Sequence, residues 1–148
     1  MNNYLVIGFG FFAQFLFFAR TIVQWFKSEH EGEIISPVIY WQISLLASIL
    51  MLTYGIFRND FSIVLGQVLV YSVYIRNLQL KNAWKKMHWI TRMLAVVIPV
   101  IYLCWLVFGE NHNFSSILKN DNVSLFLLIW GSAGQVIFNS RFLYQWIY

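Results

Sequence analysis

The chain has 148 residues, of which 59% are hydrophobic, 20% are aromatic and 11% are charged. Soluble globular domains carry roughly 25% charged residues, so this composition excludes an ordinary water-soluble protein and favours one whose surface faces lipid. The formal net charge of +4 is too small to indicate a nucleic-acid partner, and we expect none. The single cysteine, Cys104, excludes an internal disulfide.

Five apolar segments predict five transmembrane helices, because about 20 mostly apolar residues span a bilayer. The first segment has no basic residue before it and no cleavage signal, so we expect a retained helix rather than a signal peptide. Ser36 and Pro37 are typical of a helix start, with Ser36 as the N-cap. Asp60 is expected to cap the third helix, and Pro99 to kink the fourth. The expected helices cover residues 4–26, 37–57, 61–80, 89–108 and 123–148.

Basic residues between the third and fourth segments predict the topology. Lys and Arg concentrate in cytoplasmic loops of membrane proteins. We therefore expect this region on the cytoplasmic side, the N-terminus outside and the C-terminus in the cytoplasm. The cluster consists of Arg76, Lys81, Lys85, Lys86 and Arg92.

The first and last segments share a pattern of six residues at one constant offset. The pattern is Gly10, Gln14, Phe17, Arg20, Gln24 and Trp25 in the first, and Gly131, Gln135, Phe138, Arg141, Gln145 and Trp146 in the last. Both copies run in the same direction under the predicted topology, so we expect a parallel repeat. A three-helix unit, a linker helix and a second unit would produce it. We expect two helices of the second unit to be missing, through truncation or a shortened gene, or to be supplied by a neighbouring subunit.

Helical spacing places the repeated polar side chains on one stripe, which should face protein or a cavity rather than lipid. Arg20 and Arg141 could grip a phosphate or carboxylate. They could equally snorkel to the interface or pair with a carboxylate such as Glu29. A second polar face on the third helix could bind a sugar or headgroup, although hydrogen bonding between helices is the favoured interpretation. The expected substrate-binding residues are Arg20, Gln14, Gln24, Gln67, Tyr71, Tyr74, Asn77, Gln135, Arg141 and Gln145.

A series of residues in the first three segments resembles a known family. The series is Ala19, Arg20, Gln24, Trp25, Ser28, Glu29, Ser36, Pro37, Trp41, Ser44, Tyr54, Asp60, Gly66, Gln67, Tyr71, Tyr74, Arg76, Asn77 and Leu78. It resembles the lipid A biosynthesis N-terminal domain over about residues 4–80. That domain occurs fused to some lipid A disaccharide synthases and as stand-alone membrane proteins, and is similar to PQ-loop and SWEET sugar transporters, which are built from triple-helix bundles.

The resemblance implies an all-α membrane protein with a SWEET-like layout. Residues 4–80 would form the three-helix unit, residues 81–122 the basic loop, linker helix and outer loop, and residues 123–148 the first helix of a second, incomplete unit. Ala19-Arg20 and Ser140-Arg141 stand where the PQ-loop families have Pro-Gln, so the rocking mechanism of SWEETs is not carried over. The glycosyltransferase part of the synthases is absent, and no nucleophile or general-base constellation replaces it, so we expect no catalytic residue.

These observations favour a protein of the bacterial inner membrane that binds, and could translocate, a lipid headgroup, a lipid-linked sugar or a small sugar. The alternative is a non-catalytic anchor or accessory subunit for a lipid A biosynthetic enzyme. The expected partners are membrane lipids, a sugar-containing ligand, and either a second copy of the chain or such an enzyme. No cofactor or metal is expected, because the three histidines are scattered without metal-ligand spacing.

Overall fold

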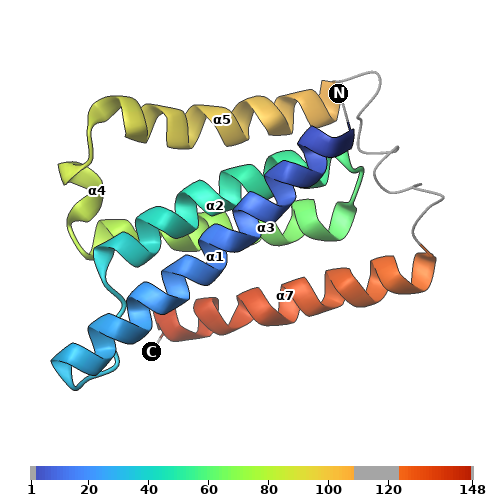
Figure 1. Cartoon of the computed structure of the whole chain (residues 1–148). Helices are drawn as coiled ribbons and strands as arrows, with labels where there is room; N and C mark the ends of the chain where they lie inside the picture. Colours follow the sequence, from blue (N-terminus) through green and yellow to red (C-terminus); the bar gives the residue numbers. More distant parts are fainter. Residues whose placement is uncertain (1–2, 109–123, 148) are drawn as a thin grey trace.

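A computed structural model describes residues 3–108 and 124–147, and every regular element in these two ranges is a helix (Figure 1). The helices are α1 (Asn3–Glu31), α2 (Val38–Phe57), α3 (Phe61–Leu80), α4 (Ala83–Lys86), α5 (Trp89–Phe108) and α7 (Leu125–Ile147). A long helix forms in each of the five predicted segments, and the bounds of the third and fourth are those predicted. The expected outer loop, residues 109–122, lies outside the described residues.

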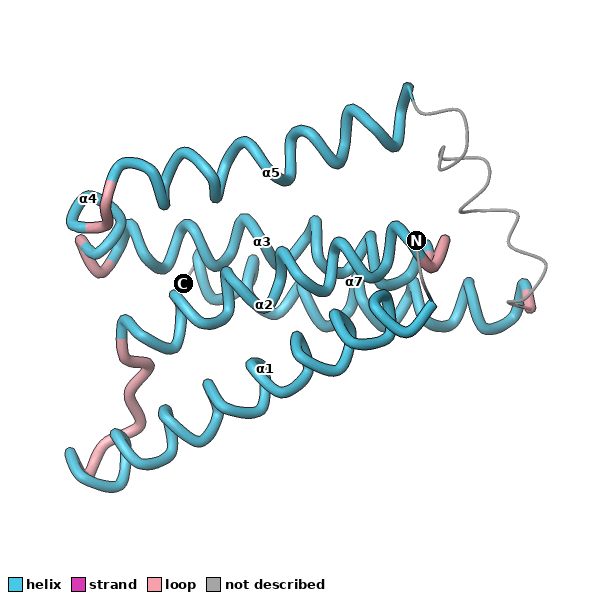
Figure 2. Tube along the Cα trace, turned by 45° about the horizontal axis from the view of Figure 1, so that its top comes forward, coloured by secondary structure: helices cyan, strands magenta, loops and turns pink. Residues whose placement is uncertain are grey.

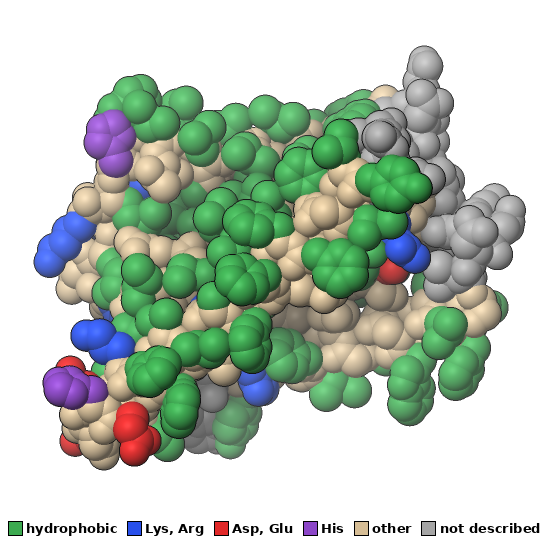
Figure 3. Space-filling model, viewed as in Figure 1, with side chains coloured by type: hydrophobic (Ala, Val, Ile, Leu, Met, Phe, Trp, Pro, Cys, Tyr) green, Lys and Arg blue, Asp and Glu red, His purple; other side chains and the backbone are tan. Residues whose placement is uncertain are grey.

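Three helices of the described part are long and apolar enough to cross a membrane, namely α1, α2 and α3. In α5, Trp89–Trp105 is a shorter apolar helix. Large hydrophobic side chains cover much of the surface drawn in Figure 3, and the charged side chains gather mostly toward the two ends of the bundle. Such a surface fits a lipid environment better than water.

Two helix starts show how far local sequence signals reach. The side chain of Asp60 accepts a hydrogen bond from the backbone N–H of Ile63 at 3.2 Å, which confirms the predicted cap of α3. The N-cap predicted at Ser36 is wrong, because α2 begins at Val38 after Pro37 and has no side-chain cap. The Ser36 hydroxyl instead accepts a hydrogen bond from Nε2 of Gln24, 3.2 Å away on α1.

The first helix continues to Glu31, five residues beyond its expected end at residue 26. The charged residues after Phe26 mark the end of the apolar stretch and not the end of the helix. Lys and Glu are good helix formers, so the helix extends past this point. Gly32, with φ of +70°, follows the last helical residue, as glycine commonly does at helix C-termini.

The long helices lie side by side and alternate in direction, so that α1, α3 and α7 run one way and α2 and α5 the other (Figures 1 and 2). Helix α2 packs against α1, α3 and α5, while α7 packs on α3. The core is centred on α2 and α3, where Leu45, Leu78 and Val73 are buried. The parallel direction predicted for the first and last helices is therefore present in the bundle, and α3 lies between the α1–α2 pair and α7.

Candidate functional site

Arg20 joins three helices. Its Nη1 donates hydrogen bonds to Ser44 Oγ on α2 at 2.6 Å and to Tyr74 Oη on α3 at 3.0 Å. Its guanidinium carbon lies 4.6, 4.9 and 5.5 Å from the ring centres of Phe17, Tyr40 and Tyr74. Hydroxyls and aromatic faces, rather than the carboxylate of Glu29 considered as a partner, thus surround this cation in the described part of the chain.

A small central cavity lies between α1, α3 and α7. It has a volume of about 160 Å³, and its polar lining comes from Arg20, Gln67, Tyr74, Gln135 and Asn139. Among the described residues, Arg20 Nε and Asn139 Oδ1 are buried without a hydrogen-bond partner. Asn139 is only 5% exposed, and its Nδ2 donates to the backbone oxygen of Gln135 at 2.8 Å. A buried polar atom without a partner is costly, so these two atoms lower the stability of the packing beside this cavity.

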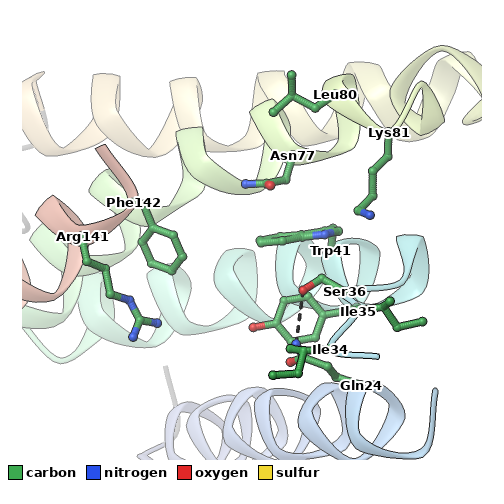
Figure 4. Close-up of a pocket in the computed structure, with 11 residues that line it drawn as sticks. Gln24, Ile34, Ile35, Ser36, Trp41, Asn77, Leu80, Lys81, Arg141 and Phe142 are labelled. Atoms are coloured by element: carbon green, nitrogen blue, oxygen red, sulfur yellow. Dashed lines mark hydrogen bonds between the residues drawn. The ribbon is translucent and has the colours of Figure 1, made fainter. Parts of the chain in front are cut away.

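A larger cavity, which we call the end cavity, opens at the end of the bundle where α1, α3 and α7 finish and α2 begins (Figure 4). Its volume is about 680 Å³, within the range of ligand-binding sites in proteins. Lys81 and Arg141 approach it from opposite sides of Trp41. The remaining polar lining comes from Gln24, Ser36, Tyr40 and Asn77.

Trp41 and Arg141 differ in how accessible their donor groups are from the end cavity. Trp41 is 7% exposed, and its indole Nε1 is buried with no hydrogen-bond partner among the described residues. Arg141 is exposed, and its guanidinium carbon lies 4.2 and 4.7 Å from the ring centres of Phe138 and Phe142 on its own helix. Arg141 and Lys81 can only donate hydrogen bonds, so together they favour an electron-rich ligand such as a phosphate.

The predicted binding residues do not form one site in the structure, because most of them are divided between the two cavities. Arg20, Gln67, Tyr74 and Gln135 line the central cavity, whereas Gln24, Asn77 and Arg141 line the end cavity. The two arginines predicted to act together therefore line different cavities.

Two predicted binding residues line neither cavity, and the side chain of a third is not among the described residues. Gln14 is exposed and lines a separate cavity near the start of α1, beside Tyr54 and Arg58. The hydroxyl of Tyr71 donates to the backbone oxygen of Ala95 at 2.5 Å and so faces α5. The side chain of Gln145 lies outside the described residues.

Several predicted polar residues bond between helices, which is the interpretation favoured for the polar face of α3. Ser48 Oγ donates to Gln67 Oε1 at 2.8 Å, and Tyr74 accepts from Arg20. Asn139 was not predicted, although an asparagine four residues after Gln135 in an apolar helix is the signal that could have found it. Within the described ranges, no group of three or more His, Cys, Asp or Glu side chains could hold a metal ion.

Comparisons with known proteins point in one direction. Residues 9–79 match the model of the Lipid A Biosynthesis N-terminal domain family. A lipid-A-disaccharide synthase from Chlamydia pneumoniae is 27% identical to this chain, in an alignment that covers 98% of the chain and 25% of the synthase. The same enzyme from Chlamydia trachomatis serovar D is 26% identical over 94% of the chain and 24% of its length. The chain thus spans about a quarter of the length of these relatives. No solved structure matches.

The family match covers most of α1 and all of α2 and almost all of α3, including Arg20 and its partners on the other two helices. The alignments with the two synthases extend over nearly the whole chain and therefore beyond that region. These findings support the predicted resemblance to the lipid A family. The similarity to PQ-loop and SWEET proteins stays a prediction.

Proposed function

From the match of residues 9–79 to the Lipid A Biosynthesis N-terminal domain family, we propose that this chain is a membrane protein of lipid A metabolism that binds the anionic head of a lipid or lipid-linked sugar. The binding site is the end cavity. The observation that carries the proposal is the pair of cations, Lys81 and Arg141, that line the end cavity.

The chemistry of the end cavity fits a phosphorylated sugar. Arg141 has a planar guanidinium that can donate two parallel hydrogen bonds to a phosphate, and Lys81 adds a compact positive charge. Gln24 and Asn77 offer amide groups that can donate to and accept from hydroxyls. The rings of Tyr40 and Trp41 provide flat apolar surface beside them.

The position of the end cavity fits a lipid ligand of the inner leaflet. It lies where α3 ends in Lys81 and beside the short helix α4, whose last residues are Lys85 and Lys86. Basic residues of this kind mark the cytoplasmic side, where anionic headgroups lie at the membrane surface. We place the C-terminal end of α7 on this side and the start of α1 outside.

For the whole bundle we propose the arrangement of helices that the sequence predicts. Five helices span the membrane, with α1–α3 as one unit, α5 as a linker and α7 as the first helix of a second unit. The shared direction of α1 and α7 supports this arrangement, as do the matching residues of their polar stripes. A bundle of this kind could move its ligand between leaflets, with the central cavity on the path.

Ligand binding can be tested on the full chain in nanodiscs, with phosphatidylglycerol as the anionic probe and native mass spectrometry to count retained lipid. We expect Arg141→Gln combined with Lys81→Gln to weaken retention at least tenfold. Hydrogen bonds to charged groups contribute about 1.5–3 kcal/mol, and about 1.4 kcal/mol corresponds to tenfold in affinity. The matched control is Arg76→Gln, which removes an exposed cation of α3 that does not line the end cavity. Equal retention by the double variant and the wild type would contradict the proposal.

A second candidate function is that of an anchor or accessory subunit for a lipid A enzyme. The supporting observation is that the chain matches about a quarter of two relatives that are themselves lipid-A-disaccharide synthases. Mild cross-linking in native membranes should then join the chain to a cytoplasmic glycosyltransferase or acyltransferase. Absence of such a partner, with lipid retention intact, would favour the binding function over this one.

A further inference from the structure

A groove between α2 and α5 lies apart from both cavities of the candidate site. Its volume is about 490 Å³, and apolar side chains form most of its wall. The aliphatic part consists of Leu45, Leu46, Ile49, Leu94, Ala95 and Ile98. None of these residues lines the central or end cavity, so the groove needs an explanation of its own.

The polarity of the groove changes along the helices. Gln42 on α2 and His88 and Thr91 on α5 lie at the end near the basic loop. Further along both helices the lining is aliphatic, up to Ile49 and Ile98. A groove that is polar at the membrane surface and apolar toward the bilayer centre matches the polarity of a lipid, with its head at one end and its chain at the other.

A small cationic cavity shares lining residues with both the groove and the end cavity. It has a volume of about 180 Å³, and its lining includes Lys81 and Lys86. It shares Gln42 and Met87 with the groove and shares Lys81 with the end cavity. The apolar groove, the cavity with two lysines and the cavity lined by Arg141 are therefore neighbours in the bundle.

We propose that the α2–α5 groove binds the acyl chain of an anionic lipid whose phosphate lies against Lys81 and Lys86. This inference rests on the proposed function of the end cavity and narrows it, because it assigns a place in the bundle to the acyl chain of the lipid. The positive charge at the mouth of the groove complements a phosphate and distinguishes this occupant from an uncharged lipid or an apolar helix of another protein.

The physical roles of head and chain differ. A chain that moves from bilayer to groove exchanges one apolar surface for another, so burial by itself supplies little affinity. The phosphate contacts supply the attraction, and the groove fixes where the chain lies and packs against it. Blocking the groove should therefore weaken binding of the whole lipid and leave binding of its detached head unchanged.

The test uses the full chain and compares two double variants. Leu46→Trp with Leu94→Trp fills the groove from positions that are 51% and 45% exposed, where a larger ring can be accommodated without disturbing the core. Val96→Trp with Val100→Trp is the control, since both positions lie on α5, are 48% and 50% exposed and do not line the groove.

Three probes are used, namely phosphatidylglycerol, phosphatidylcholine with the same chains, and glycerophosphoglycerol, the deacylated head of the first. We expect wild type to retain phosphatidylglycerol over phosphatidylcholine in nanodiscs, as counted by native mass spectrometry. In the groove variant, the ratio of retained phosphatidylglycerol to retained phosphatidylcholine should fall at least threefold. In the control variant this ratio should stay at the wild-type value. Binding of glycerophosphoglycerol, measured by calorimetry, should be the same in all three proteins.

The failure of this inference can be told apart from failure of the proposed function. If the groove variant retains phosphatidylglycerol as well as wild type does, the groove is not the chain site, whatever the end cavity binds. If retention by the groove variant falls equally for phosphatidylcholine, the groove binds lipid without regard to charge and the inference is overturned. If Arg141→Gln with Lys81→Gln leaves both phosphatidylglycerol and glycerophosphoglycerol binding unchanged, the proposed function itself fails.

Discussion

Helices α1 and α7 carry the same polar pattern, but their surroundings differ. Arg20 of α1 bonds to hydroxyls on two other helices and lies among three aromatic rings. Arg141, at the same place in the pattern of α7, is exposed and contacts two phenylalanine rings of its own helix. The arginine of the first copy is bonded to neighbouring helices beside the central cavity, and the arginine of the second copy lines the end cavity. A repeated pattern thus fixes which face of a helix is polar, while the neighbouring helices decide what that face does.

The difference follows from helix partners. Helix α1 packs along α2, whereas α7 packs on α3. On α1 the repeated arginine finds Ser44 and Tyr74 as partners, so its role is largely structural. On α7 Asn139 keeps an unpartnered buried oxygen and Arg141 points to the end cavity. We therefore expect substitutions on the stripe of α1 to lower stability, and substitutions on the stripe of α7 to change binding instead.

The largest expected effect comes from comparing Arg20→Met with Arg141→Met. Loss of Arg20 removes two interhelical hydrogen bonds of about 0.6 kcal/mol each and cation–π contacts worth about 2 kcal/mol when desolvated, so unfolding should become easier by about 3 kcal/mol. Loss of the exposed Arg141, whose ring contacts lie on its own helix, should cost about 1 kcal/mol or less. Steric trapping in detergent micelles measures both free energies of unfolding. If both variants lost the same free energy of unfolding, the two arginines would not differ in their structural role.

Much of the fold could be read from the sequence, because long apolar segments with clear breaks determine where membrane helices lie. The bounds of α3 and α5 were predicted correctly for this reason. The end of α1 was placed too early, since charged residues that end an apolar stretch can still be helical. The start of α2 was misjudged because Ser36 bonds to Gln24 across a loop, a contact that no local signal reveals.

The candidate site was less predictable, because cavities depend on how helices pack. Helical spacing placed Arg20, Gln67 and Tyr74 on inward faces, and they do lie between helices. The same spacing could not tell that Tyr71 turns to α5 or that Lys81 reaches the end cavity. Those outcomes depend on which helix lies next to which face, and a single sequence does not contain that information.

The second-largest expected effect on stability concerns the first glycine of the repeated pattern, Gly10 in α1 and Gly131 in α7. A Cβ added at Gly10 would lie 2.8 Å from the ring of Tyr54, a rigid group that cannot move aside without shifting a helix. At Gly131 the nearest atoms are Oγ and Cβ of Ser62 at 3.0 and 3.2 Å, so the clash is milder, although only the Oγ can rotate away. We expect Gly10→Ala to destabilise by about 2 kcal/mol from overpacking, partly offset by the better helix propensity of alanine. Thermal unfolding of the two alanine variants, side by side, gives the comparison.

Gly131→Ala should be nearly neutral in that measurement, because the gain in helix propensity opposes a mild clash. A loss at Gly131 as large as the loss at Gly10 would mean that α7 is packed on α3 as tightly as α1 is packed on α2. The asymmetry between the two copies would then be confined to their arginines.

A smaller effect of opposite sign is expected at Asn139. Its Oδ1 is buried without a partner among the described residues, so replacing the side chain by leucine, which has the same branched outline, removes a desolvated acceptor. Asn139→Leu should therefore stabilise the protein by about 1 kcal/mol. Chemical denaturation in micelles provides the measurement. A loss of stability would show that the polar lining of the central cavity holds α7 in place, which would make the two stripes alike.

The smallest expected effect comes from a substitution that removes one hydrogen bond of Arg20 and keeps its contacts with aromatic rings. Tyr74→Phe removes the hydroxyl that accepts from Arg20 but keeps the ring, 5.5 Å from the guanidinium carbon. The expected cost is about 0.6 kcal/mol, the average for a hydrogen bond between membrane helices. A double-mutant cycle with Arg20→Met should return a coupling energy of that size. Retention of phosphatidylglycerol should not change, because Tyr74 does not line the end cavity. Weaker lipid retention in Tyr74→Phe would instead link the two cavities, and would place the stripe of α1 in the binding site as well as in the fold.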